Sequence, residues 1–198
     1  MHNILVPLGT SKHAENTLAY AIAFAARFNS TIYVIDAYPV HSSKATLSNV
    51  NTRLQEDNVK RIKGLVTKIA SKNQKIKIVS SERDLIGSIR NLNETIGLDL
   101  IVTAPLNNEI NEAVFLGRIA GSVIKRTHIP VLVAPIEKSF QPPKRMLLAF
   151  KTGEVKASST LKPLISLQDQ FKSKLKLLLV KVPGFANRNH QLNDELMQ

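Results

Sequence analysis

The sequence predicts an α/β protein built on a parallel β-sheet, followed by part of a second copy of the same unit. Short apolar runs alternate five times with helical apolar spacing over about the first 135 residues, a pattern typical of parallel α/β sheets. The 198-residue chain is 43% hydrophobic and 21% charged, so it is able to bury a core. A strand–helix–strand pattern then begins again near Arg145.

The first unit opens with an apolar strand at Ile4–Val6 and a helix that Thr10 or Ser11 would cap. The second strand covers Thr31–Ile35, and a polar loop at His41–Asn49 separates it from a long helix. The apolar face of the first helix consists of Leu18, Ala21, Ile22, Ala25 and Ala26. The apolar stripe of the long helix consists of Val59, Ile62, Leu65, Val66 and Ile69.

The next two strands differ in charge. Lys75–Val79 alternates basic and apolar residues, which favours the edge of the sheet because charge there discourages unwanted pairing. Leu98–Val102 is instead typical of a buried central strand. Helices are predicted from near Asp84 and over Leu116–Val123, and a fifth strand at Val131–Ala134 completes the unit.

The second unit begins after Gln141–Pro143, a plausible linker because two prolines stiffen the chain and stop helices. Met146–Phe150 repeats the first strand, and Leu161–Phe171 repeats the first helix with Pro163 in its first turn. Leu175–Val182 repeats the second strand. These patterns predict a β–α–β segment.

The sequence thus predicts three regions: an α/β domain at residues 1–136, a linker at 137–144, and an incomplete second domain at 145–198. A β–α–β piece cannot cover its own apolar faces, and its strands would present open edges. Two interpretations stay open. Either the chain is a fragment of a longer tandem protein, or the half-domain docks on another copy.

Three segments resemble the universal stress protein family: Ile4–Pro7, Asp99–Val102 and Leu116–Val133. Within the third, the distance from Gly117 to Pro130 matches that of the family. The resemblance extends over residues 2–135 and, more loosely, over 145–183. It implies a flavodoxin-like (Rossmann-like), doubly wound sheet of five parallel strands. It also implies a homodimer formed through the fifth strand, by Val131, Leu132 and Val133.

One branch of this family binds ATP through a glycine, two residues, a second glycine, nine residues, and then glycine with Ser or Thr. Glycines let the backbone approach the phosphates, and a helix N-terminus supplies N–H groups. Such a site lies outside the carboxyl ends of the strands. Aligned on Gly117 and Pro130, the motif has Ala104 and Asn107 at its first two glycines and Arg118 in place of Ser or Thr.

A second alignment, on Gly121–Ser122, restores the final dipeptide but puts Asn108 and Asn111 at the glycines and shortens the distance to Pro130, so we reject it. The adenine side departs as well, because Gly9 stands where the branch has an acidic residue. We therefore expect a degenerate pocket that does not bind ATP in the family manner, and no cofactor. Its residues are Pro7, Gly9, Ala104, Asn107, Gly117 and Arg118.

Arg118 has two interpretations. Its guanidinium suits bidentate capture of a phosphate or another anion. Alternatively, it fills the vacated pocket or pairs with Glu109 or Glu112. Asn107 tolerates a positive φ and is a conformational substitute for glycine. Asp36, after the second strand, is a strand-end carboxylate for which the sequence identifies no partner.

The sequence shows no basis for catalysis or metal binding, so we expect a protein that is not an enzyme. It has no Cys, no Gly-x-Ser-x-Gly elbow and no phosphate loop ending in Gly-Lys. Its histidines lack the spacing of metal ligands. They are His2, His13, His41, His128 and His190.

The net charge of +12 favours anions and nucleic acids in general. However, no aromatic residue lies between Tyr38 and Phe115 to stack on bases beside the basic long helix, which argues against nucleic-acid binding. No apolar run is long enough for a membrane span, and Met1–Ile4 lacks the features of a signal peptide. We therefore expect a cytoplasmic protein that does not bind membranes.

These observations favour a stress-linked regulatory or interaction module that forms a homodimer and contacts protein partners of unknown identity. The alternative is a sensor of ATP, AMP or another phosphate ligand, with a rewired pocket at Arg118 and the start of the fourth helix. A third hypothesis, nucleic-acid binding driven by charge, predicts an affinity that falls steeply with salt.

Overall fold

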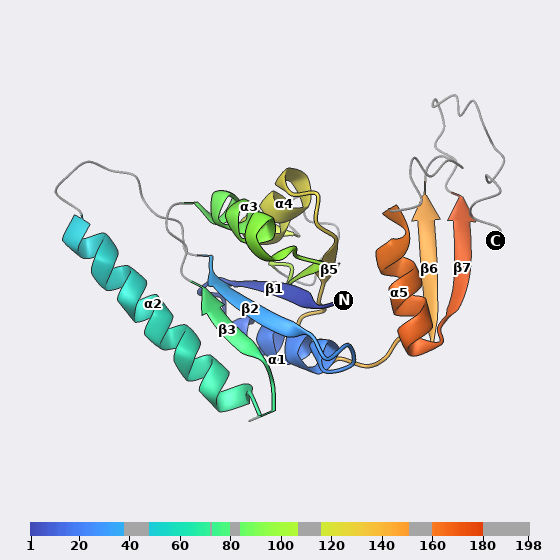
Figure 1. The fold of residues 1–198 in the computed structure, drawn as a ribbon, viewed down its shortest axis with the longest axis horizontal. Helices are drawn as coiled ribbons and strands as arrows, with labels where there is room; N and C mark the ends of the chain where they lie inside the picture. The colour runs from blue at the N-terminus through green and yellow to red at the C-terminus, as the bar shows by residue number, and fades with distance from the viewer. Residues whose placement is uncertain (38–47, 72, 80–83, 107–115, 151–159, 180–198) are drawn as a thin grey trace. The chain divides into compact units, whose positions relative to one another are not determined.

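Parallel strands and helices alternate along the chain in a computed structural model (Figure 1). The structure describes residues 1–37, 48–71, 73–79, 84–106, 116–150 and 160–179, without the side chains of 48–55 and 150. The chain divides into two units, Met1–Phe140 and Gln141–Gln198. The boundary falls inside the predicted linker.

The first unit contains a five-stranded parallel sheet with the order β3-β2-β1-β4-β5. This confirms the predicted doubly wound sheet, and β3 occupies an edge as its charge pattern indicated. The order reverses at β1, which pairs with β2 on one side and β4 on the other. The strands are β1 (Asn3–Leu8), β2 (Thr31–Asp36), β3 (Ile76–Val79), β4 (Leu100–Thr103) and β5 (Val131–Val133).

Helices cover both faces of this sheet (Figure 1). Helices α1 (Ala14–Ala25) and α2 (Ser48–Ile69) lie on one face, and α3 (Leu85–Ile96) and α4 (Gly117–Arg126) lie on the other. Because both faces are covered, β1 is buried without alternation from Ile4 to Leu8.

The core beneath α3 and α4 is made of apolar side chains from the central strands and these two helices. Leu5 and Ile101 are fully buried there, together with Ile89 of α3 and Val123 of α4. Burial of this kind contributes about 1.5–3 kcal/mol per large apolar side chain. It fixes the two helices against the sheet and thereby positions the loops at both sheet edges.

Helix α3 begins where the sequence predicts, because the Asp84 carboxylate accepts a hydrogen bond from the Gly87 N–H at 2.9 Å. The predicted cap of the first helix is wrong. Helix α1 begins at Ala14 after His13, and the Ser11 hydroxyl accepts from the His13 N–H at 3.1 Å. Ser11 therefore stabilises a turn before the helix, and neither it nor Thr10 is the N-cap.

Asp99 ties the N-terminus to the start of β4. Its carboxylate accepts hydrogen bonds from the backbone N–H groups of His2 at 2.6 Å and Asn3 at 2.9 Å. Burial opposes ionisation of Asp99, but the N–H bonds from Asn3 and His2 outweigh it and lower its pKa below the ordinary value. The strand starts at Leu100, two residues later than predicted, because residue 99 is engaged with the N-terminus.

Unit 1 extends past the predicted domain end at residue 136. Ile136 is buried, and the Phe140 ring packs edge-on against Tyr20 and Phe24, with centroid distances of 5.4 and 5.5 Å. Aromatic pairs of this geometry contribute about 0.5–1.5 kcal/mol beyond area burial. Phe140 thus anchors the start of the predicted linker to α1.

The second unit is a parallel pair of strands, β6 (Arg145–Phe150) and β7 (Lys174–Leu179), with α5 (Lys162–Phe171) between them in sequence. A proline lies in the first turn of α5, as predicted. Residues 180–182 of the predicted last strand lie outside the described residues. Burial alternates along β7, and Leu147 and Leu178 of the same sheet face are 61% and 44% exposed.

Candidate functional site

The candidate site lies at the carboxyl edge of the unit 1 sheet, where the strand order reverses. β1 ends at Leu8 and its neighbour β4 ends at Thr103. Ligands of doubly wound sheets bind outside the carboxyl ends of the strands at such a reversal. Most of the residues predicted for the degenerate pocket are described, and the structure brings the loops that carry them together at this edge.

Pro7 and Gly9 belong to the end of β1. Pro7 is buried inside the strand, opposite Ile35 of β2, so it supports the edge from within and presents no surface to a ligand. Gly9 follows the strand and faces the Ile119 side chain of α4. A Cβ added at Gly9 would lie 2.8 Å from Ile119 Cδ1. The terminal methyl group of Ile119 therefore borders this position, and a larger residue here would require that methyl group to shift.

Gly117 begins α4 with φ +65°, in the left-handed region that glycine adopts without strain. A Cβ at Gly117 would also lie 2.9 Å from Cβ of Leu106, which belongs to the segment after β4. Leu106 is 54% exposed. Gly117 is therefore required both by the backbone conformation and by the close approach of Leu106.

Arg118 lies in the first turn of α4 and is exposed. The N-cap residue Leu116 provides no side-chain hydrogen bond to the N–H groups that begin the helix. Among the described residues, no carboxylate lies within ion-pair distance of Arg118. Ala104 is half-buried after β4. Asn107, and the possible partners Glu109 and Glu112, lie outside the described residues.

The other acidic and histidine residues named by the sequence do not converge on this edge as a reactive group. Asp36 is 7% exposed at the end of β2 and presents little surface to a ligand. His13 is the N-cap position of α1, without a side-chain cap. In the described part of the chain, no three His, Cys, Asp or Glu side chains gather as metal ligands would. No helix described by the structure has the length and apolarity needed to cross a membrane.

The predicted dimer strand lies at the outer edge of the sheet. Val131, Leu132 and Val133 pair with β4 on one side and are half-buried. The Ile101 N–H donates to the Pro130 carbonyl, and the Ala134 N–H donates to the Thr103 carbonyl. Because parallel ladders alternate, the backbone groups of Val131 and Val133 point away from β4.

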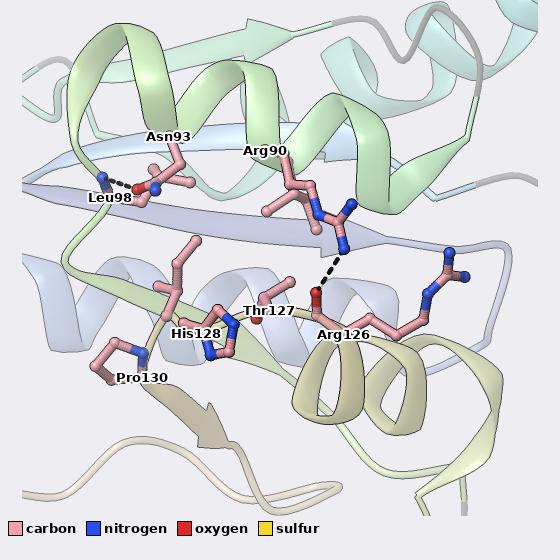
Figure 2. A pocket seen from close by; sticks show the side chains of 9 residues that line it. Arg90, Asn93, Leu98, Arg126, Thr127, His128 and Pro130 are labelled. Carbon is pink, nitrogen blue, oxygen red and sulfur yellow. Dashed lines mark hydrogen bonds between the residues drawn. The ribbon is translucent and has the colours of Figure 1, made fainter. Parts of the chain in front are cut away.

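Sequence reasoning missed a cavity of about 360 Å³ between α3 and the segment that joins α4 to β5 (Figure 2). Arg90, Asn93 and His128 line it. Arg90 and Asn93 lie one turn apart on α3, but His128 is far from them in sequence and the three match no motif, so no local pattern indicated that they meet. His128 was noted only as one of several scattered histidines.

Comparison with known proteins identifies the family of this chain. Residues 1–135 match the model of the universal stress protein family. No curated protein sequence matches.

Solved structures share the fold at low sequence identity. The universal stress protein UspA from Lactobacillus plantarum is 19% identical, with a TM-score of 0.50 over 69% of this chain and 97% of its own. A universal stress protein from Archaeoglobus fulgidus is 15% identical, also with a TM-score of 0.50, over 69% and 98%.

A longer chain from Pseudomonas aeruginosa, solved as a universal stress protein, is 16% identical with a TM-score of 0.54. It covers 90% of this chain and 61% of its own length. At these identities the three likenesses show the fold alone. The family assignment rests on the match over residues 1–135, and the chain belongs to the universal stress protein family.

Proposed function

We propose that this chain is a regulatory or interaction module of the universal stress protein type, without chemistry of its own, that does not hold ATP in the manner of the family's ATP-binding branch. One observation carries the proposal: Gly9 stands where that branch has the acidic residue on which its adenine side depends. The position is bordered by an apolar group, since Ile119 Cδ1 lies 2.8 Å from where a Cβ of residue 9 would stand.

The phosphate side of the pocket supports the same proposal. Leu106 approaches Gly117 so closely that the segment after β4 lies against the start of α4. An apolar side chain there provides no hydrogen bond to a phosphate oxygen. Two apolar side chains, Ile119 and Leu106, thus stand on the two sides of the edge where polar contacts to a nucleotide are needed.

Isothermal titration of the full chain with ATP and with AMP tests this proposal. We expect no heat of binding at micromolar affinity from either nucleotide. Binding of either at micromolar affinity or tighter would contradict the proposal, and Arg118→Ala would then show whether the nucleotide lies at this edge.

A second candidate function is a sensor of a nucleotide or another phosphate-bearing ligand held by Arg118. The observation that favours it is that the guanidinium is exposed beside a helix start whose N-cap provides no side-chain bond. In this case phosphate should raise the melting temperature of the wild-type chain, and Arg118→Ala should abolish that shift. An equal shift in both proteins would dispose of this candidate.

The proposed module acts as a homodimer through β5. The support is the geometry of the open edge, where Val131 and Val133 direct backbone donors and acceptors outward from an apolar strand. Two such edges can pair with each other and bury their valine side chains. Light scattering of the full chain at several concentrations measures the oligomeric state. A monomer at high concentration would contradict the proposed homodimer.

A further inference from the structure

The cavity between α3 and the segment 126–130 is separate from the site at the carboxyl edge. It is lined by Leu98, which precedes β4, and by Pro130, which precedes β5, so it opens at the amino ends of these strands. Gly9 and Arg118 follow the carboxyl ends of β1 and β4. The two sites therefore lie at opposite edges of one sheet.

This cavity has an apolar floor and a cationic rim. Ile89 and Leu98 are buried in its floor, and Ile129 and Pro130 close one side. Arg90 and His128 are exposed at its mouth. A volume of about 360 Å³ falls within the range of about 300–1,000 Å³ that small-molecule pockets occupy.

Hydrogen bonds hold the polar side chains in place. Arg90 reaches across from α3 and donates to the carbonyl of Arg126 at 3.3 Å (Figure 2). The Asn93 amide oxygen accepts from the Leu98 N–H at 2.8 Å, which leaves the amide NH₂ as a donor beside the cavity. The Arg126 side chain extends away from His128, whereas Arg90, Asn93 and His128 all belong to the lining of the cavity (Figure 2).

No acidic side chain balances Arg90 and Arg126 in the described lining of the cavity. The nearest carboxylate in sequence to Leu98 is Asp99, and the N–H groups of His2 and Asn3 occupy it. By contrast, the hollow between α1 and α2 is lined by Lys68 and Glu15, whose charged atoms pair at 2.8 Å. The lining of that hollow thus contains a carboxylate beside its two lysines, Lys12 and Lys68, whereas the lining of the cavity at Arg90 contains none.

We propose that this cavity binds a small organic anion: a carboxylate or phosphate group held by Arg90, Asn93 and His128, with an apolar body against Leu98, Ile129 and Pro130. The guanidinium and the amide supply N–H donors to the oxyanion. The floor takes the body of the ligand out of water. An inorganic ion would contact only the polar rim of the cavity, and a neutral apolar molecule would contact only its floor.

Titration of the ¹⁵N-labelled full chain by NMR tests the site with defined probes. Phenyl phosphate and benzoate carry an oxyanion on an apolar body, inorganic phosphate carries the anion alone, and benzyl alcohol carries the body alone. We expect phenyl phosphate or benzoate to shift the amides of 89–98 and 127–129, and to bind more tightly than the other two probes. The tighter of the two anions identifies whether the natural ligand is a phosphate or a carboxylate.

Two arginine variants locate the binding. Arg90→Gln should lower the affinity for the tighter-binding probe by about tenfold or more, because it removes a charge-assisted hydrogen bond. Arg118→Ala, at the opposite edge, should leave the affinity unchanged, which separates this site from the proposed phosphate sensor. If Arg90→Gln does not fold, His128→Gln is the second variant, and it should also lower the affinity for the probe.

Three results would overturn the proposal. The first is the absence of amide shifts with phenyl phosphate and benzoate up to about 10 mM. The second is inorganic phosphate binding as tightly as phenyl phosphate, which would remove the role of the apolar floor. The third is an affinity that survives Arg90→Gln and His128→Gln, or one that Arg118→Ala abolishes.

Discussion

Replacement of Gly117 by alanine tests how closely the segment after β4 lies against α4. Two costs are expected. A residue with a Cβ at φ +65° costs about 1–2 kcal/mol relative to glycine. The new Cβ would also stand 2.9 Å from Leu106 Cβ, which is attached directly to the backbone and cannot rotate away. Overpacking of this kind adds about 1–3 kcal/mol.

Two other glycines separate these costs. Gly97 has φ +64° and nothing within 4 Å of an added Cβ, so Gly97→Ala carries the backbone cost of about 1–2 kcal/mol alone. Gly121 lies inside α4 with nothing within 4 Å, so Gly121→Ala should stabilise the protein by about 0.5–1 kcal/mol. The loss in Gly117→Ala should exceed that in Gly97→Ala, at about 2–5 kcal/mol.

Urea unfolding followed by far-UV circular dichroism measures these differences as changes in midpoint at constant slope. Leu106→Gly removes the atom in conflict, so it should recover part of the loss in the Gly117→Ala background. Equal losses in Gly117→Ala and Gly97→Ala would refute the close approach of Leu106. A Gly117→Ala protein as stable as wild type would refute the left-handed conformation at position 117.

Three further predictions concern other parts of unit 1. Val133→Pro removes an outward-facing donor of β5 without touching its ladder to β4, so light scattering should report a monomer, whereas Val133→Thr should stay dimeric. Because the pKa of Asp99 is lowered in the folded state, its stabilisation is present above the unfolded pKa and is lost as pH falls through the folded pKa. Unfolding free energies measured from pH 7 to below about pH 4 should therefore fall less steeply in Asp99→Asn than in wild type. Asp84→Ala should cost about 1 kcal/mol in urea unfolding and Asp84→Ser should recover most of it; equal losses would contradict the capping role.

The fold was largely predictable because it depends on local periodicity. The burial of β1 on both faces and the charge alternation of β3 are visible in the sequence, and the Asp84 cap is a short-range pattern. Element ends were less predictable where distant residues decide them. Asp99 leaves the strand because the N-terminus binds it, and Phe140 joins unit 1 because its ring meets Tyr20 and Phe24.

For the second unit, sequence periodicity predicts the order of the elements but not what covers its sheet. The β–α–β order is observed, but Leu147 and Leu178 stand exposed on one face of a two-stranded sheet. A doubly wound sheet covers both faces, so this face requires a cover. The likeness to the longer Pseudomonas aeruginosa chain covers 90% of this chain, which is more than residues 1–140 supply. Whether another copy or further chain provides the cover stays a prediction.

The sequence predicted which motif residues the candidate site lacks, but it did not predict which side chains border the site. Gly9 and Arg118 differ in residue type from the acidic residue and the Ser or Thr of the ATP-binding branch, so the sequence alone indicates that polar contacts to a nucleotide have changed. Ile119 and Leu106 carry no such signal, since in sequence Ile119 is one more member of an apolar helix stripe and Leu106 one apolar residue in a polar segment. Their roles follow from the crossover that sets α4 over the end of β1, which brings Ile119 within contact of Gly9. A degenerate motif therefore predicts a lost ligand contact, whereas only the packing shows which side chains border the vacated position, and at Gly9 the bordering group is the apolar end of Ile119.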